Sequence, residues 1–197
     1  YCYIAGLFGM VNEKQVAMGE SSTSGRRECR NTDGWFQIST LSCIGLERGA
    51  TAREAIQVMG TLAEEYGFKE GGEMLAVGDP NEAWIFEIAG PGILWSQGDG
   101  QGAYWVAQRV PDGHVAACAN NAVIDEIDFD DTDNFMYSPG IVEFAIENGW
   151  YDPDSGETFS WRKHFMHATN ATGSGRRVKL VFSLVAPSIE DELNEVD

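Results

Sequence analysis

Apolar residues recur along this chain at spacings that predict both helices and strands. The clearest helix opens with the capping box Thr51–Glu54 and continues at helical spacing until Gly67. Its predicted buried residues are Ala55, Ile56, Met59, Leu62, Ala63 and Tyr66. A second helix is predicted to begin at Ser138–Pro139, residues suited to the N-cap and the first helical position. A short helix is expected over residues 40–48, and residues 178–185 are apolar without a clear period.

Strand-like segments occupy the middle of the chain, separated by turns that contain Gly, Pro and Asp. The predicted strands are residues 16–18, 74–77, 83–88, 104–110 and 114–119. Along residues 83–88 both alternating sets are largely apolar, so both faces of this strand are expected to be covered. Consecutive antiparallel strands beside helices predict the α+β class, with residues 1–197 in a single domain.

The composition excludes several functional classes. The chain has 197 residues, 43% of them hydrophobic, and a formal net charge of −18, which opposes binding to nucleic acid or to anionic membranes. No apolar run reaches transmembrane length. The four cysteines lack C-x-x-C spacing, and the acidic runs 125–133 and 152–157 fit no EF-hand register. Neither a metal site nor a cofactor is therefore expected.

Two adjacent carboxamides, Asn120 and Asn121, are the first candidates for chemistry. They follow a predicted hairpin, in which residues 104–110 and 114–119 flank a Pro-Asp-Gly turn. An uncharged amide at a strand end can donate hydrogen bonds to a substrate oxygen, as an oxyanion hole requires. On spacing alone the ordinary interpretation is favoured, in which both side chains satisfy loop backbone groups.

Several segments in a fixed order resemble one family, the dipeptidase-type N-terminal-nucleophile hydrolases, which include bacterial dipeptidases and secernins. The segments are NEKQVAMGESS (Asn12–Ser22), TAREAIQVM (Thr51–Met59), EEYGF (Glu64–Phe68), GDPNEAWIFEI (Gly78–Ile88), YWVAQRVPDGHVAACAN (Tyr104–Asn120), YSPGIVEFAIENGWYD (Tyr137–Asp152) and VFSLVAPS (Val181–Ser188). Each segment is weak evidence, but their order is fairly specific and spans nearly the whole chain.

The resemblance implies a four-layer αββα sandwich and a cysteine nucleophile exposed by removal of a leader. In such a family the nucleophile lies well upstream of the Asn12–Gln15 motif, so this chain resembles the central part of a longer polypeptide. Cys2 is then a structural residue. The implied activity is release of amino acids from short peptides, mainly dipeptides, and a homo-oligomer is compatible with the family.

Individual residues can be assigned by the same resemblance. Asn120 occupies the position of the Asn in a His-Ala-Asn-Gln motif, and is the expected donor to the oxyanion or the substrate carbonyl. Asn121 replaces the Gln of that motif and is expected to support substrate binding. The run Glu20-Ser21-Ser22 corresponds to a Glu-Thr-Thr run that lines the site, and Arg177 to an Arg-Val pair at the cleft.

Three functional hypotheses remain open from the sequence. The first is a cysteine-type dipeptidase that takes a small peptide substrate, with Glu20 facing its free amino group. The second is an amidase acting on N-acyl amino acids or other small amides. The third is a non-catalytic, secernin-like interaction module. The compartment is left open.

Overall fold

The computed structural model describes residues 1–166 and 172–187, which form an α+β structure around one antiparallel sheet. The seven strands lie in chain order: β1 (Tyr3–Ala5), β2 (Gly9–Asn12), β3 (Ala17–Glu20), β4 (Glu73–Gly78), β5 (Ala83–Ala89), β6 (Tyr104–Val110) and β7 (Phe135–Tyr137). The helices are α1 (Ile38–Arg48), α2 (Ala52–Tyr66), α3 (Ile141–Glu147), α4 (Trp161–Phe165) and α5 (Thr172–Val185), with short 3-10 turns at Arg27–Cys29 and Pro153–Ser155. No helix in these described ranges is both long and apolar enough to span a bilayer.

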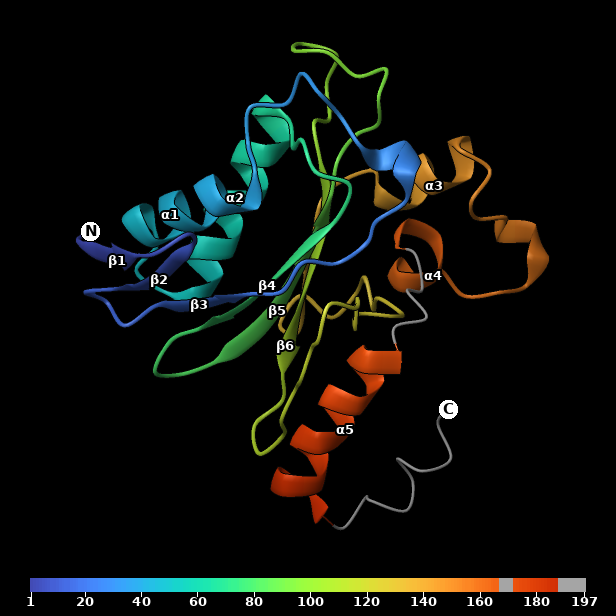
Figure 1. Cartoon of the computed structure of the whole chain (residues 1–197). Helices are drawn as coiled ribbons and strands as arrows, with labels where there is room; N and C mark the ends of the chain where they lie inside the picture. The colour runs from blue at the N-terminus through green and yellow to red at the C-terminus, as the bar shows by residue number, and fades with distance from the viewer. Residues whose placement is uncertain (167–171, 188–197) are drawn as a thin grey trace.

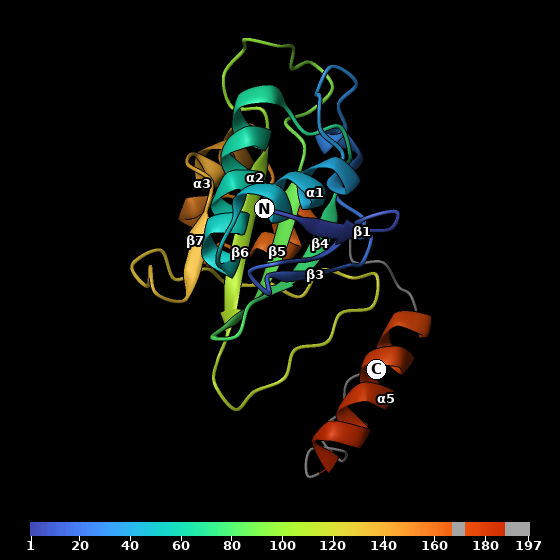
Figure 2. The same cartoon turned by 90° about the vertical axis from the view of Figure 1, so that its left-hand side faces the viewer.

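The sheet separates two hydrophobic cores. Helices α1 and α2 cover one face, while α3, α4 and the long connections near them cover the other (Figure 1). Figure 2 looks onto the sheet from the side of α1 and α2. The first core joins both helices to β3–β6, and the second contains an aromatic group from the C-terminal half, namely Phe135, Phe159, Trp161 and Phe165.

Strand β5 confirms the prediction that both of its faces are covered. It pairs with β4 through Ala83–Ile88 and with β6 over its full length, with Phe86 opposite Leu75 and Ala107. The side chains of Trp84, Phe86 and Ile88 belong to the core under the helices, whereas Ile85 and Ala89 belong to the opposite core. Every residue of β5 after its first is buried, so the alternating pattern fixes which side chains reach each core.

Helix α2 confirms the strongest helix prediction. The Thr51 hydroxyl accepts a hydrogen bond from the Glu54 amide at 3.2 Å, and the Glu54 carboxylate accepts one from Ala50 at 2.8 Å. The helix ends before Gly67, whose φ of 81° is disfavoured for residues with a side chain. The expected helix over residues 40–48 is also present, but it begins two residues earlier.

The predicted strand over residues 114–119 is wrong. After β6 the chain runs without regular structure through residues 111–134, and β7 pairs with β6 in its place. The physical reason is the small size of the alanines in 114–119, which bury little apolar area, whereas Phe135 of β7 packs into the second core. Asn120 therefore lies in an irregular segment and not at a strand end.

Two other element predictions need adjustment. Ser138 is not the N-cap of α3, because its hydroxyl accepts a hydrogen bond from the Trp105 amide at 3.0 Å. The helix begins at Ile141, after Gly140 in the left-handed region. The apolar residues 178–185 belong to helix α5.

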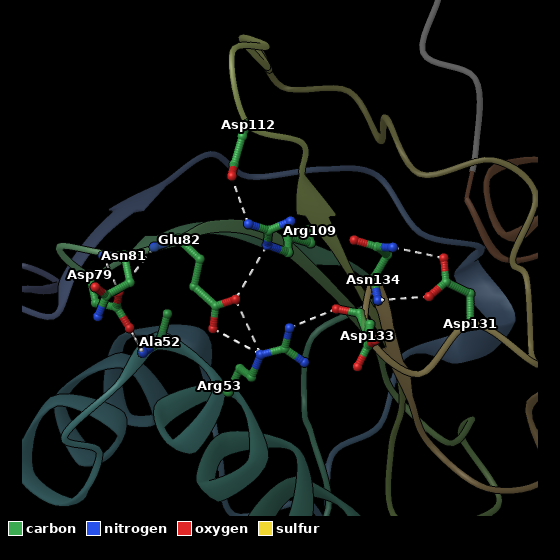
Figure 3. A network of polar contacts seen from close by, with 10 residues as sticks. All are labelled: Ala52, Arg53, Asp79, Asn81, Glu82, Arg109, Asp112, Asp131, Asp133 and Asn134. Atoms are coloured by element: carbon green, nitrogen blue, oxygen red, sulfur yellow. Dashed lines mark hydrogen bonds and ion pairs between the residues drawn. The ribbon is translucent and has the colours of Figure 1, made fainter.

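A polar network joins the helix layer to one end of the sheet (Figure 3). Glu82, beside the start of β5, forms ion pairs with Arg53 of α2 at 2.9 Å and with Arg109 of β6 at 3.4 Å. Asp79 accepts hydrogen bonds from the amides of Ala52, Asn81 and Glu82. Burial raises the pKa of Asp79, but these three hydrogen bonds and the Arg53 charge together lower it by a larger amount. The net effect is a pKa below the usual value.

We predict that Gly60→Ala destabilises the fold, because this glycine lets α2 approach the sheet closely. A Cβ at residue 60 would lie 2.3 Å from the buried Trp105 ring, which is hydrogen bonded to Glu64. Overpacking of this kind costs about 1–3 kcal/mol, which thermal or urea unfolding would measure. The matched control is Gly175→Ala in α5, where a Cβ meets nothing within 4 Å. Equal stability of the two variants would contradict this account of the packing.

Candidate active site

Residues far apart in the sequence meet around the end of strand β3. The strand ends at Glu20, and the Ser21 amide still donates to the Met74 carbonyl at 3.1 Å, which continues the ladder with β4. The chain then leaves the sheet as a loop of small polar residues. Asn120 connects segment 119–121 to this loop by hydrogen bonds, and Arg177 of helix α5 bonds in turn to Ala119 and Asn120 of that segment.

Asn120 is held by hydrogen bonds from its backbone and its side chain. Its amide donates to the Ser21 hydroxyl at 2.9 Å, and its Nδ2 donates to the Ser22 carbonyl at 2.9 Å. Its φ of 59° lies in the left-handed region, which Asn tolerates better than most residues. These contacts fix the plane of a carboxamide that is exposed at the surface of the described chain.

Arg177 of α5 brings a positive charge to the same carboxamide. Its guanidinium donates to the Asn120 Oδ1 at 3.0 Å and to the Ala119 carbonyl at 3.1 Å. A charged donor on Oδ1 withdraws electron density from the amide and makes its N–H groups stronger donors. The predicted residues Arg177, Asn120, Ser21 and Ser22 thus form one connected hydrogen-bond network.

Glu20 extends this network toward a group of carboxyls. The Ser22 hydroxyl donates to Glu20 at 2.7 Å. Burial, together with the nearby carboxyls of Glu70 and Glu20, raises the pKa of Glu73 to about 8. Burial also raises the pKa of Glu70. Glu73 therefore carries a proton near neutral pH, and a cationic group placed beside it would favour its ionised form.

A polar cavity of about 950 Å³ adjoins these carboxyls. Thr23 and Ser24, which follow Ser22 directly, form part of its wall. Glu70 and Glu73 also line the cavity, as do the basic side chains of Arg27, Arg30 and Lys69. The cavity wall thus contains both acidic and basic side chains, which suits a ligand that has one positive and one negative group.

Asn121 lies next to Asn120 in sequence but lines a different cavity. That cavity, of about 640 Å³, is bordered by Asp125, Glu157, Arg162 and Lys163. The structure therefore brings five of the six predicted residues into one network, and Asn121 borders the neighbouring surface.

The cysteines near this site are poorly suited to act as nucleophiles. Burial, and secondarily the charge of Glu87, raises the pKa of the Cys118 thiol to about 11. Burial likewise raises the pKa of Cys29 to about 12. Both thiols are protonated at neutral pH, and the thiolate is the reactive form. Within residues 1–166 and 172–187, no group of three or more His, Cys, Asp or Glu side chains is arranged to hold a metal ion.

Sequence reasoning missed two carboxyls, Glu73 and Glu87. Glu87 is fully buried in β5 and accepts hydrogen bonds from Val123, Ile124 and Trp161. Its signal was present in the sequence, because an acidic residue inside a strand expected to be covered on both faces requires polar partners. Glu73 gave no comparable signal, since it stands at the first position of its strand.

Comparison with known proteins agrees with the resemblance described above. Residues 6–196 match peptidase family C69. The chain is 36% identical over 144 residues to a probable dipeptidase of Latilactobacillus sakei. This alignment covers 70% of this chain and 28% of that protein. It is 35% identical over 102 residues to a dipeptidase of Bifidobacterium longum, covering 50% of this chain and 17% of that protein. The matched part of the chain thus spans only 17–28% of the length of these curated relatives. It belongs to peptidase family C69.

Proposed function

We propose that this chain forms the carbonyl-binding part of a peptide-bond hydrolase that acts on dipeptides. The observation that carries the proposal is the fixed carboxamide of Asn120. The Ser22 carbonyl and the Arg177 guanidinium bond to this side chain, and the Ser21 hydroxyl holds the Asn120 backbone amide. A preorganised donor of this kind stabilises the charge that develops on a carbonyl oxygen during attack. The family and its relatives named as dipeptidases supply the reaction class.

The nucleophile in this proposal is an N-terminal cysteine located upstream of the chain. Its thiolate attacks the peptide carbonyl carbon, and its α-amine takes the thiol proton and returns it to the departing amine. The carbon–nitrogen bond breaks, and water then hydrolyses the thioester. The raised thiol pKa values of Cys29 and Cys118 argue against these two cysteines as the nucleophile.

The same proposal assigns the sheet to an N-terminal-nucleophile hydrolase sandwich of four layers. The antiparallel order of β1–β7 and the α1–α2 layer on one face are compatible with one half of such a sandwich. In the described residues, α3, α4 and irregular segments occupy the other face.

The carboxyls around Glu20 favour a substrate with a free amino group. Besides burial, the charge of Glu20 raises the pKa of both Glu70 and Glu73, so a substrate ammonium beside these carboxyls offsets this repulsion. An N-acyl amino acid has no such cation. The site therefore favours dipeptides over the amidase alternative.

We predict that Asn120→Ala lowers kcat for dipeptide hydrolysis by about 10²-fold, the usual effect of losing one oxyanion donor. The measurement is steady-state kinetics of the whole protein. Asn120→Gly is the matched variant, because glycine accepts the φ of 59° without strain while also lacking the amide. Both variants should lose activity equally. Activity within a few-fold of wild type for Asn120→Gly would refute the carbonyl-binding role.

We predict that Glu20→Gln raises KM for dipeptides by about 10-fold, equivalent to 1.4 kcal/mol of lost attraction to the ammonium group. The same dipeptides carrying an N-acetyl group should show no change between wild type and variant. Glu13→Gln, an exposed change at the turn before β3, is the control. If wild type prefers the acetylated compounds, the amidase hypothesis replaces the dipeptidase hypothesis.

A further inference from the structure

Glu87 is a buried carboxyl for which the proposed reaction has no direct use. It stands in the centre of β5, opposite Met74 of β4 and Val106 of β6, and its side chain has no solvent exposure. A charge in such surroundings is costly unless it is hydrogen bonded. Its presence therefore requires an explanation in terms of the groups that it contacts.

The groups that Glu87 contacts belong to the segment that carries Asn120. Its Oε1 accepts from the backbone amides of Val123 at 2.7 Å and Ile124 at 3.3 Å, and its Oε2 accepts from the Trp161 indole at 2.8 Å. Since residues 111–134 form no regular strand, these amides have no partners in a strand ladder. Buried backbone amides need an acceptor, and Glu87 supplies it.

We infer that Glu87 is a positioning residue. Its hydrogen bonds anchor the segment that carries Asn120 to strand β5, and thereby set the position of the Asn120 carboxamide. Asn120 precedes the anchored Val123 by three residues, and Ala122 and Ile124 are buried in the second core. The opposite side of Asn120 is held by Ser21, Ser22 and Arg177. The catalytic part of this inference rests on the proposed function of Asn120.

The ionisation of Glu87 affects how well the anchor works. Burial raises the pKa of Glu87 to about 7, against the opposing effects of its three donors and the Arg162 charge. Arg162 on α4 also forms an ion pair with Asp125. Burial and, to a lesser extent, the Glu87 charge raise the pKa of the Cys118 thiol, which lies in the irregular segment. Facing residues of β4 and β6 are the apolar Met74 and Val106.

Protonation of Glu87 replaces one accepting site by a donor while three N–H groups still face the carboxyl. The anchor is therefore complete above pH 7 and weakens as the pH falls through about 7. The opposite sign applies to global stability: because the folded-state pKa is raised above the ordinary value of 4.5, the contribution of Glu87 to stability is lost as the pH rises from about 4.5 to about 7. Positioning and stability thus respond to pH in opposite directions.

Three variants of the whole protein test this inference. Glu87→Leu removes both acceptors and Glu87→Gln keeps one accepting oxygen. The control Trp161→Phe removes the indole donor but leaves both acceptors of Glu87 in place. The measurements are hydrogen exchange of the Val123 and Ile124 amides, and kcat and KM for a dipeptide between pH 6 and pH 8.

We predict at least about 10-fold faster exchange of both amides in Glu87→Leu than in Trp161→Phe, as expected when amides lose a charged acceptor. The kcat of Glu87→Leu should fall by about 10-fold with KM changed by less. Glu87→Gln should lie between Glu87→Leu and wild type. It should also lose the decline in amide protection and kcat that wild type shows below pH 7.

The outcomes separate the two proposals. Exchange in Glu87→Leu equal to that in Trp161→Phe would overturn the anchoring role. If Glu87→Leu does not fold, a pH profile of amide protection in Glu87→Gln identical to that of wild type would overturn it instead. Faster exchange with unchanged kcat would show that Glu87 holds the segment but would overturn its part in positioning Asn120. The carbonyl-binding role of Asn120 is tested separately by Asn120→Gly, whose kcat does not depend on Glu87.

Discussion

The burial of strand β5 on both faces is the constraint on which the rest of this structure depends. Its alternating side chains serve two cores, so its register against β4 and β6 cannot slip by one residue. Such a slip would point Phe86 away from α2 and place the Glu87 carboxyl under the helices. The register therefore fixes both the packing of the helix layer and the location of the buried Glu87 carboxyl.

The Glu87 carboxyl also connects the sheet to a segment that has no regular secondary structure. Glu87 holds the amides after Asn120, and the serines after β3 hold Asn120 itself. The carboxamide is thus positioned by hydrogen bonds to side chains on rigid strands and to the loop that follows one of them. Rigid support of this kind is what electrostatic stabilisation of a reacting carbonyl requires.

Local sequence patterns predicted the central elements well. Helix α2, the β4–β5 hairpin and β6 follow from capping, periodicity and turn residues. The prediction of a strand over residues 114–119 was wrong for a physical reason. Pairing with β6 depends on apolar burial between distant segments, and Phe135 of β7 buries more apolar area than the alanines of residues 114–119. The grouping of Glu20, Ser21, Ser22, Asn120 and Arg177 came from the family resemblance, since no local pattern links residues 157 positions apart. Glu87 could have been found from the sequence, as a charge within a doubly covered strand.

The central claim is that Asn120 binds the carbonyl oxygen of a peptide under attack. A crystal structure of the whole protein with a dipeptide aldehyde tests it most directly, because the thiol adduct of an aldehyde carries an oxygen where the tetrahedral intermediate carries its charge. That oxygen should lie within about 2.7–3.1 Å of the Asn120 Nδ2, with the Arg177 contact retained. An adduct oxygen bound by other donors, with the Asn120 carboxamide directed elsewhere, would contradict the carbonyl-binding role of Asn120.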